Sequence, residues 1–260
     1  MEQRHQLRLQ LKRLRMSGLL QTLDVRTTQA IDGQWTYTEF LIRLLEDEIN
    51  RRDQMQLARR IRRAAISTTK TLEGYDFSFN PQVNRQRVLE LATCTYIRQK
   101  RNVLICGPTG VGKTHLAQAL GHEACRQGFN VLFSNTYQML RHLNGGRADG
   151  TFEKRMQTYL RPALLILDDF GLKSLQPPAP EDLYDVISGR YERGSILVTS
   201  NRDLPEWPDL FNAPLLASAG LDRLTHQAQV VIITGRSYRA HGTSTTTANE
   251  EVSTDPTSLA

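Results

Sequence analysis

A glycine-rich stretch, GPTGVGKT at residues 107–114, has the spacing of a phosphate-binding loop. Its glycines allow successive backbone N–H groups to point at a bound phosphate, and the helix expected after it adds a positive end. Lys113 supplies a cation for the β- and γ-phosphates, and the Thr114 hydroxyl can coordinate Mg²⁺. The residues expected to bind the nucleotide are Gly107, Pro108, Thr109, Gly110, Val111, Gly112, Lys113, Thr114 and His115.

Two adjacent carboxylates, Asp168 and Asp169, follow the apolar run Leu-Leu-Ile-Leu at 164–167. If that run is a strand beside the phosphate loop, Asp168 is expected to hold Mg²⁺, and Asp169 to orient or deprotonate the attacking water. A solvated turn is the alternative for an isolated pair of acids. The apolar run and the phosphate loop on the same chain favour catalysis.

A third polar group, Asn201, follows the apolar run at 196–199. If this strand lies between the other two, the Asn201 amide sits beside the γ-phosphate. There it can hold the attacking water or sense the phosphate. An asparagine that merely ends a strand is the alternative.

A parallel sheet is needed to bring these residues together, because the carboxyl ends of its strands meet at one edge. Short apolar runs, typical of strands buried on both faces, alternate with helical patterns. The runs are 103–106, 131–134, 163–167, 196–199 and 230–234, and a helix is expected over 83–99. The sequence therefore predicts an α/β fold with a five-stranded parallel sheet flanked by helices.

The first part of the chain, residues 1–65, is expected to be a small all-helical domain. Within it, the polar stretch 27–34 is expected to be a loop. Thr36 and Glu39 have the spacing of a capping box that opens a long helix. The other expected segments are a linker at 66–82, the α/β core at 83–240 and a disordered tail at 241–260.

Charge is unevenly distributed along the 260 residues. The chain has 33 Lys and Arg against 27 Asp and Glu; 14 of the former and 8 of the latter lie in residues 1–70, which therefore carry the whole net charge of +6. Such a surplus predicts a polyanion partner for this region. Six arginines share one expected helix: Arg51, Arg52, Arg59, Arg60, Arg62 and Arg63.

Composition excludes several classes of protein. With 39% hydrophobic and 23% charged residues, the chain is neither disordered nor fibrous. No apolar run is long enough for a membrane span and no signal peptide is evident, so we expect a cytoplasmic protein without a membrane partner. The three cysteines lack metal-ligand spacing and are expected to be buried free thiols.

Several segments together resemble the DnaC/IstB group of AAA+ ATPases: GPTGVGKTHLA, LLILDDFG, LVTSNRDLPEW and LDRLTHQAQVVIITGRSYR. The N-terminal stretches LKRLRMSGLLQTLD and EFLIRLLEDEINRRDQMQLARRIRRA are more narrowly similar to IstB-like helper ATPases of IS21-type transposable elements. The resemblance covers residues 5–240. It implies an AAA+ core that uses ATP and Mg²⁺ and works as a homo-oligomer.

The resemblance also implies residue roles. Asn201 matches the first sensor, and Arg223 matches the arginine finger that reaches the γ-phosphate of a neighbouring subunit; from the residues alone, Arg223 could instead pair with Asp222 or a surface acid. Asp169 stands where most AAA+ proteins have Glu. Few residues follow the last strand, so we expect the lid to be reduced or absent. Candidates for a second sensor are Arg236 and Arg239.

For function, the resemblance implies a transposition helper that oligomerises on duplex DNA with ATP, in a ring or helix. It would deform target DNA, recruit or activate a transposase, and hydrolyse ATP to disassemble. The six arginines are then expected to contact the DNA backbone; a solvated helix face or a protein-docking site is the alternative. Rival functions are a DnaC-like replicative helicase loader, a DNA-coating protein with ATP as assembly ligand, and a metabolite kinase.

Overall fold

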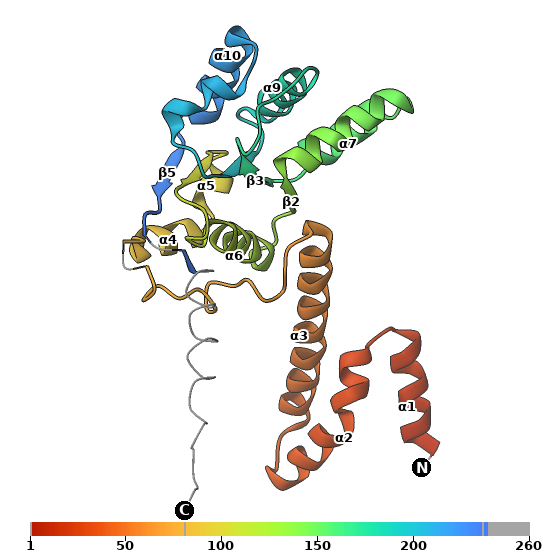
Figure 1. Cartoon of the computed structure of the whole chain (residues 1–260). Coiled ribbons are helices and arrows are strands. Elements are labelled where there is room, and N and C mark those ends of the chain that lie inside the picture. Colours follow the sequence, from red (N-terminus) through yellow and green to blue (C-terminus); the bar gives the residue numbers. More distant parts are fainter. Residues whose placement is uncertain (1, 81, 236, 239–260) are drawn as a thin grey trace, which may run out of the picture. The chain divides into compact units, whose positions relative to one another are not determined.

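The computed structural model describes residues 2–80, 82–235 and 237–238. The chain divides into two compact units between Arg60 and Ile61 (Figure 1). The division falls inside a long helix, upstream of the expected boundary at residue 65, and Ile61 and Ala64, which follow it, are buried. The tail expected at 241–260, and Arg236 and Arg239, lie outside the described residues.

The first unit consists of three helices: α1 (Glu2–Arg13), α2 (Ser17–Asp32) and the first part of α3 (Tyr37–Ala64). Its small core contains Leu11, Leu19, Leu23 and Leu44. The Thr36 hydroxyl accepts a hydrogen bond from the Glu39 backbone N–H at 3.2 Å, so α3 begins directly after the predicted capping residue.

The prediction of a loop at 27–34 was wrong. Helix α2 continues to Asp32 and ends at Gly33. The hydroxyls of Thr27 and Thr28 donate to the carbonyls four residues earlier, at 2.6 and 3.2 Å. Polar side chains can therefore be accommodated on the helix, which contains no proline to stop it.

The second unit contains a five-stranded parallel sheet in the order β2-β3-β4-β1-β5. The strands are β1 (Val103–Cys106), β2 (Val131–Asn135), β3 (Leu164–Phe170), β4 (Ser195–Ser200) and β5 (Gln229–Ile232). These are the five predicted strands, shifted by a few residues at their ends. Because β4 lies between β1 and β3, the carboxyl ends of these three strands are neighbours, as the sequence required.

Helices flank the sheet, and two short 3₁₀ turns, Leu204–Glu206 and Pro208–Leu210, follow β4. The helices are α4 (Arg85–Ala92), α5 (Thr95–Arg98), α6 (Lys113–Arg126), α7 (Thr136–Ala148), α8 (Phe152–Leu160), α9 (Ala179–Arg190) and α10 (Pro214–Thr225). The single helix expected over 83–99 is broken, because Cys94 adopts a left-handed conformation with φ +56°.

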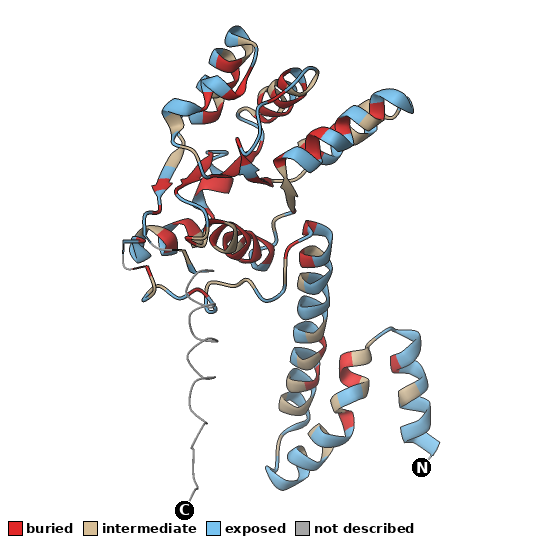
Figure 2. Cartoon of the chain, in the orientation of Figure 1, coloured by how far each residue is buried: buried red, intermediate tan, exposed pale blue. Residues whose placement is uncertain are grey.

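Both faces of the sheet are covered. One face, including Leu165 and Val198, forms the main core with residues of α7, α8, α9 and α10. The other face packs against α6, where a Cβ on Gly121 would lie 2.7 Å from Ile166 Cδ1. Helix α6 is buried along most of its length (Figure 2). The sheet and α6 therefore form a rigid base for the loop that joins β1 to α6.

The cysteines are buried free thiols, as predicted: Cys94, Cys106 and Cys125. Burial raises the pKa of Cys94 and of Cys106 to about 11. Within the described residues, no helix combines the length and the apolar character that a membrane span requires.

A buried arginine, Arg190 at the end of α9, stabilises the amino-terminal side of the sheet. Its guanidinium donates to four backbone carbonyls; the acceptors are Tyr159 (2.7 Å), Leu160 (3.2 Å), Ala163 (3.3 Å) and Ser195 (2.8 Å). Burial lowers the pKa of Arg190 to about 10. Removing this side chain would leave several buried carbonyls without a donor.

We therefore expect Arg190→Ala to lower the free energy of unfolding by about 3–5 kcal/mol, because each unpaired buried group costs about 1–3 kcal/mol. Urea denaturation followed by circular dichroism measures this change. Arg193→Ala is the control, since Arg193 is exposed and should change stability by less than about 0.5 kcal/mol. A loss below about 1 kcal/mol for Arg190→Ala would contradict the structural role.

Candidate nucleotide-binding site

The predicted phosphate-binding loop joins β1 to α6. Gly107 and Gly110 have positive φ values of 152° and 88°, a conformation that L side chains rarely adopt. A Cβ on Gly107 would collide with the Ile233 carbonyl, and one on Gly110 would collide with the Ser237 side chain. The loop thus needs glycine both for its backbone and for the close approach of the chain after β5.

Lys113, at the start of α6, is 9% exposed. Its ammonium donates to the carbonyls of Gly107 and Pro108, each at 2.7 Å. These bonds hold the lysine head group inside the curl of the loop. A phosphate entering the loop therefore meets a cation that is already positioned.

Asp168 is buried near the end of β3. Its carboxylate accepts hydrogen bonds from the Thr114 hydroxyl, at 2.9 and 3.0 Å to its two oxygens, and from the Thr199 hydroxyl. Burial raises the pKa of Asp168, and the two hydroxyls oppose that shift. Carboxylate and hydroxyl oxygens are ligands that suit Mg²⁺, so Asp168 and Thr114 fit the predicted metal site.

Asp168 and Asp169 lie in a β-bulge that directs their side chains differently. Leu167 pairs with Val198 and Phe170 pairs with Ser200, so Asp168 and Asp169 together face Thr199 alone. Asp169 has φ +55°, and its N–H donates to the Thr199 hydroxyl at 3.1 Å. The bulge therefore turns Asp168 into the interior and leaves the Asp169 side chain exposed.

Asn135, the last residue of β2, is a further polar group at this edge of the sheet that was not predicted from the sequence. Its side-chain amide donates to the Asp169 carboxylate at 3.0 Å. Its side-chain oxygen caps α7 by accepting from the N–H groups of Tyr137 and Gln138. Asn135 follows an apolar run, as Asn201 does, and this common pattern was the signal that could have identified it.

A cavity of about 710 Å³ brings most of the predicted residues together. This volume lies within the range of about 300–1,000 Å³ typical of small-molecule sites. The predicted residues that line it are Thr109, Gly110, Val111, Gly112, Lys113, Thr114, His115, Asp168, Asp169 and Asn201. Gly107 and Pro108 hold the loop through their bonds to Lys113.

The expected linker also forms a wall of this cavity, which the sequence did not predict. Tyr75 is buried against the loop, with its ring centroid 5.4 Å from that of His115. The Asn80 amide donates to the Thr234 carbonyl at 2.6 Å. Other cavity-lining residues that were missed are Lys70, Gly74, Asp76, Phe79, Leu172 and Tyr238.

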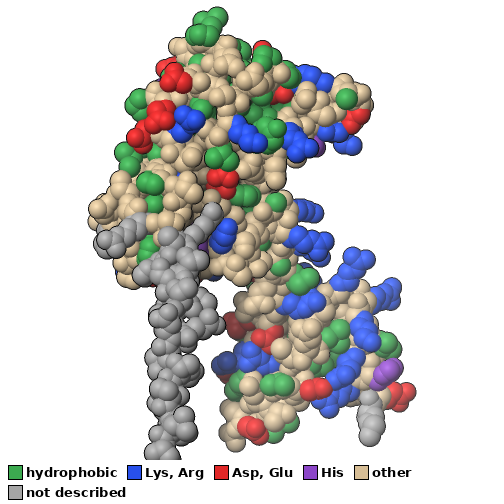
Figure 3. Space-filling view, in the orientation of Figure 1, with side chains coloured by type: hydrophobic (Ala, Val, Ile, Leu, Met, Phe, Trp, Pro, Cys, Tyr) green, Lys and Arg blue, Asp and Glu red, His purple; other side chains and the backbone are tan. Residues whose placement is uncertain are grey.

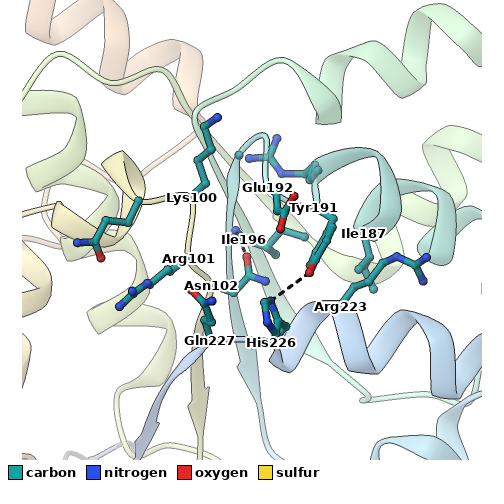
Figure 4. Close-up of a pocket in the computed structure, with 13 residues that line it drawn as sticks. Lys100, Arg101, Asn102, Ile187, Tyr191, Glu192, Ile196, Arg223, His226 and Gln227 are labelled. Atoms are coloured by element: carbon teal, nitrogen blue, oxygen red, sulfur yellow. Dashed lines mark hydrogen bonds between the residues drawn. The ribbon is translucent and has the colours of Figure 1, made fainter.

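Arg223 does not line this cavity. It lies on α10 beside a different pocket, at the amino ends of β1 and β4, with Ile187, Tyr191 and His226 (Figure 4). Among the described residues, no carboxylate pairs with Arg223; its guanidinium donates to the Ala219 carbonyl at 2.9 Å. The alternative of a pair with Asp222 is therefore not observed.

The six predicted DNA-contacting arginines all lie on α3, and Lys and Arg side chains gather over the N-terminal helices (Figure 3). Arg52 pairs at 2.7 Å with Glu48, which is buried and also accepts from the Gly18 N–H at 2.6 Å. Arg52 therefore has a structural role. Arg60 donates weakly to Gln56 at 3.4 Å. The exposed members are Arg52, Arg59, Arg62 and Arg63, and the partly exposed ones are Arg51 and Arg60.

The raised pKa of Asp168 predicts how stability depends on pH. Between the ordinary carboxyl pKa near 3.8 and the raised value, the folded protein binds more protons than the unfolded chain, so stability falls as pH rises through this window. We therefore expect Asp168→Asn to raise the Tm of the nucleotide-free protein at pH 7, with a smaller difference near pH 4. Calorimetry measures both values.

Asp169→Asn is the matched control because Asp169 is exposed; its Tm should stay within about 1 °C of the wild type. If Asp168→Asn lowered the Tm at pH 7, the cost assigned to the buried charge would be wrong.

Comparison with known proteins agrees with these observations. Residues 9–246 match the family of IstB-like ATP binding proteins. A Mycobacterium tuberculosis protein, named as an insertion-sequence ATP-binding protein, is 41% identical over 234 residues, or 90% of this chain and 93% of that protein. A relative from Pseudomonas aeruginosa, named for insertion sequence IS21, is 36% identical over 235 residues, or 90% of this chain and 89% of its own length.

Solved structures share the fold. The DnaC helicase loader has a TM-score of 0.54 at 22% identity, covering 64% of this chain and 97% of its own. The replication initiator DnaA bound to AMPPCP and single-stranded DNA has a TM-score of 0.55 at 24% identity, covering 66% of this chain and 52% of its own. This chain therefore belongs to the family of IstB-like ATP binding proteins, and its second unit has the AAA+ fold.

Proposed function

We propose that this protein is an Mg²⁺-dependent ATPase that assists transposition. It binds ATP in the cavity described above, oligomerises on duplex DNA, deforms it, and recruits or activates a transposase. The observation that carries the enzymatic part is the convergence of Lys113, Thr114, Asp168 and Asp169 on one cavity of suitable size. Family membership supports the link to transposition.

The side chains that line the cavity have different proposed roles in hydrolysis. Lys113 neutralises charge on the β- and γ-phosphates. Mg²⁺, held by Thr114 and Asp168, would supply further neutralisation of the phosphates. Asp169 is exposed to the cavity and oriented by Asn135, which suits a group that positions or deprotonates the attacking water. Asn201 orients the water or contacts the γ-phosphate.

Hydrolysis requires a second subunit in this proposal. Arg223 lies outside the cavity of its own chain, so its proposed contact with a γ-phosphate occurs in a neighbour. If each subunit places its arginine in the nucleotide site of the next subunit, the interface is heterologous. Repetition of such an interface produces a ring or a helix. The isolated monomer would therefore hydrolyse ATP slowly, because arginine fingers contribute about 10³–10⁵ in rate.

Duplex DNA is the proposed partner of the arginines on α3. Arg59, Arg62 and Arg63 are exposed and, among the described residues, are not in ion pairs. Because backbone contacts carry little sequence information, we expect weak sequence preference. A helicase loader that holds single-stranded DNA is the second candidate, favoured by the fold shared with DnaC. Competition between duplex and single strands distinguishes the two.

The role of Asp169 is tested by Asp169→Asn. We expect ATP hydrolysis with duplex DNA to fall by about 10²–10⁴, because general base catalysis contributes this much, while ATP affinity changes little. Phosphate release and binding of a fluorescent ATP analogue measure the two effects. Lys113→Ala is the comparison that should lose binding. Wild-type phosphate release by Asp169→Asn would overturn the proposed role of Asp169 as the group that activates water.

The DNA contact is tested by the double variant Arg59→Gln/Arg63→Gln, which removes two exposed charges one helical turn apart. We expect the slope of log K against log salt to flatten by about two units, as for two lost phosphate contacts. Fluorescence anisotropy of a labelled duplex measures the slope. The control is Arg4→Gln/Arg8→Gln, which removes equal charge where both arginines pair with Asp24. Duplex binding that does not depend on salt would exclude this role for α3.

A further inference from the structure

The guanidinium of Arg223 is held by two groups of its own subunit. Its Cζ lies over the ring of Tyr184, 5.5 Å from the ring centroid. Its Nη1 donates to the Ala219 carbonyl, one turn earlier on α10, at 2.9 Å. The ring sets the plane above which the guanidinium lies, and the carbonyl sets its direction. Together they restrict an otherwise flexible side chain.

Tyr184 is itself fixed between two helices. It lies on α9, and its side chain packs against α10 at Gly220, where an added Cβ would sit 3.6 Å from Tyr184 Cδ2 and 3.9 Å from Ile187 Cδ1. Tyr184 is partly buried. Because the ring packs against α10 and the Arg223 guanidinium lies over it, the ring can support that cation.

We propose that Tyr184 is a positioning residue that orients Arg223 toward the nucleotide bound by a second copy of this chain. The inference rests on the proposed function, in which Arg223 acts between subunits. A long arginine that must find its orientation at each encounter loses conformational freedom when it binds a phosphate. Stacking on Tyr184 fixes part of that orientation before the neighbour arrives, so its benefit should appear in kcat.

A second tyrosine, which lines the same pocket as Arg223, provides a matched control. Tyr191 follows α9 and lines a pocket with Arg223, but its hydroxyl contacts His226 Nδ1 at 3.1 Å (Figure 4). Replacing Tyr191 removes an equal ring from this face without removing the support under Arg223. It therefore separates positioning of Arg223 from a general effect on the surface.

The first experiment measures kcat and KM for ATP hydrolysis by the full chain with duplex DNA. Tyr184→Leu should lower kcat by about tenfold to a hundredfold, the scale of a misplaced catalytic group, while KM and the Tm change little. Tyr184→Phe keeps the ring and should retain kcat within about twofold. Tyr191→Leu should also retain kcat within about twofold. Tyr184→Met, which keeps apolar volume without a ring, replaces the leucine variant if that one fails to fold.

The second experiment mixes variants. A Lys113→Ala subunit lacks a working nucleotide site but can offer an intact Arg223, supported by Tyr184, to its neighbour. A Tyr184→Leu subunit has an intact nucleotide site that can receive this arginine. If Tyr184 supports Arg223, mixing these two variants should recover hydrolysis, as should mixing Arg223→Ala with Lys113→Ala. Recovery would also show that the Tyr184→Leu nucleotide site is folded.

The outcomes distinguish the two levels of the proposal. No recovery with Arg223→Ala would overturn action between subunits, and the role of Tyr184 with it. Recovery with Arg223→Ala but not with Tyr184→Leu would overturn the role of Tyr184 alone. Loss of kcat in Tyr184→Phe or Tyr191→Leu as large as in Tyr184→Leu would also overturn it.

Discussion

The buried carboxylate of Asp168 is the group on which the nucleotide site depends. It receives hydroxyl hydrogen bonds from the first turn of α6 and from β4, while its own strand, β3, bulges at this point. Three elements are thus fixed to one charge that burial makes costly. A cation bound beside Asp168 would offset this cost, and this is the physical reason why we propose that Mg²⁺ binds here together with the nucleotide.

In the proposed function, the chain binds two different polyanions, ATP and duplex DNA, and its charge is distributed accordingly. The net charge of +6 belongs to residues 1–70, whereas residues 71–260 are balanced. In the second unit, Lys113 and Asp168 are buried charged groups, and a few such groups can suffice for a nucleotide because electrostatic interactions are stronger away from water. A long duplex does not fit into the cavity that these two groups line, so we propose the exposed arginines on α3 as the surface that contacts it.

Sequence patterns predicted the strands and the phosphate loop well because both are local: each depends on a short apolar run or on glycine spacing. The bulge at Asp168, the contact from Asn135 and the cavity wall formed by residues 70–80 were not predictable, since each depends on tertiary contacts between distant segments. The prediction of a loop at 27–34 was wrong for a local reason. The residues of this stretch have weak local preferences, and the Thr27 and Thr28 hydroxyls bond to carbonyls within α2, so the helix continues to Asp32.

In the proposed function, ATP organises this protein into an ordered oligomer on duplex DNA, and a neighbour completes each nucleotide site. Electron microscopy of the full chain with duplex DNA, Mg²⁺ and a non-hydrolysable ATP analogue tests it most directly. We expect rings or helices on the DNA, with Arg223 of one subunit at the nucleotide of the next. Dispersed monomers on the DNA under the same conditions would contradict it.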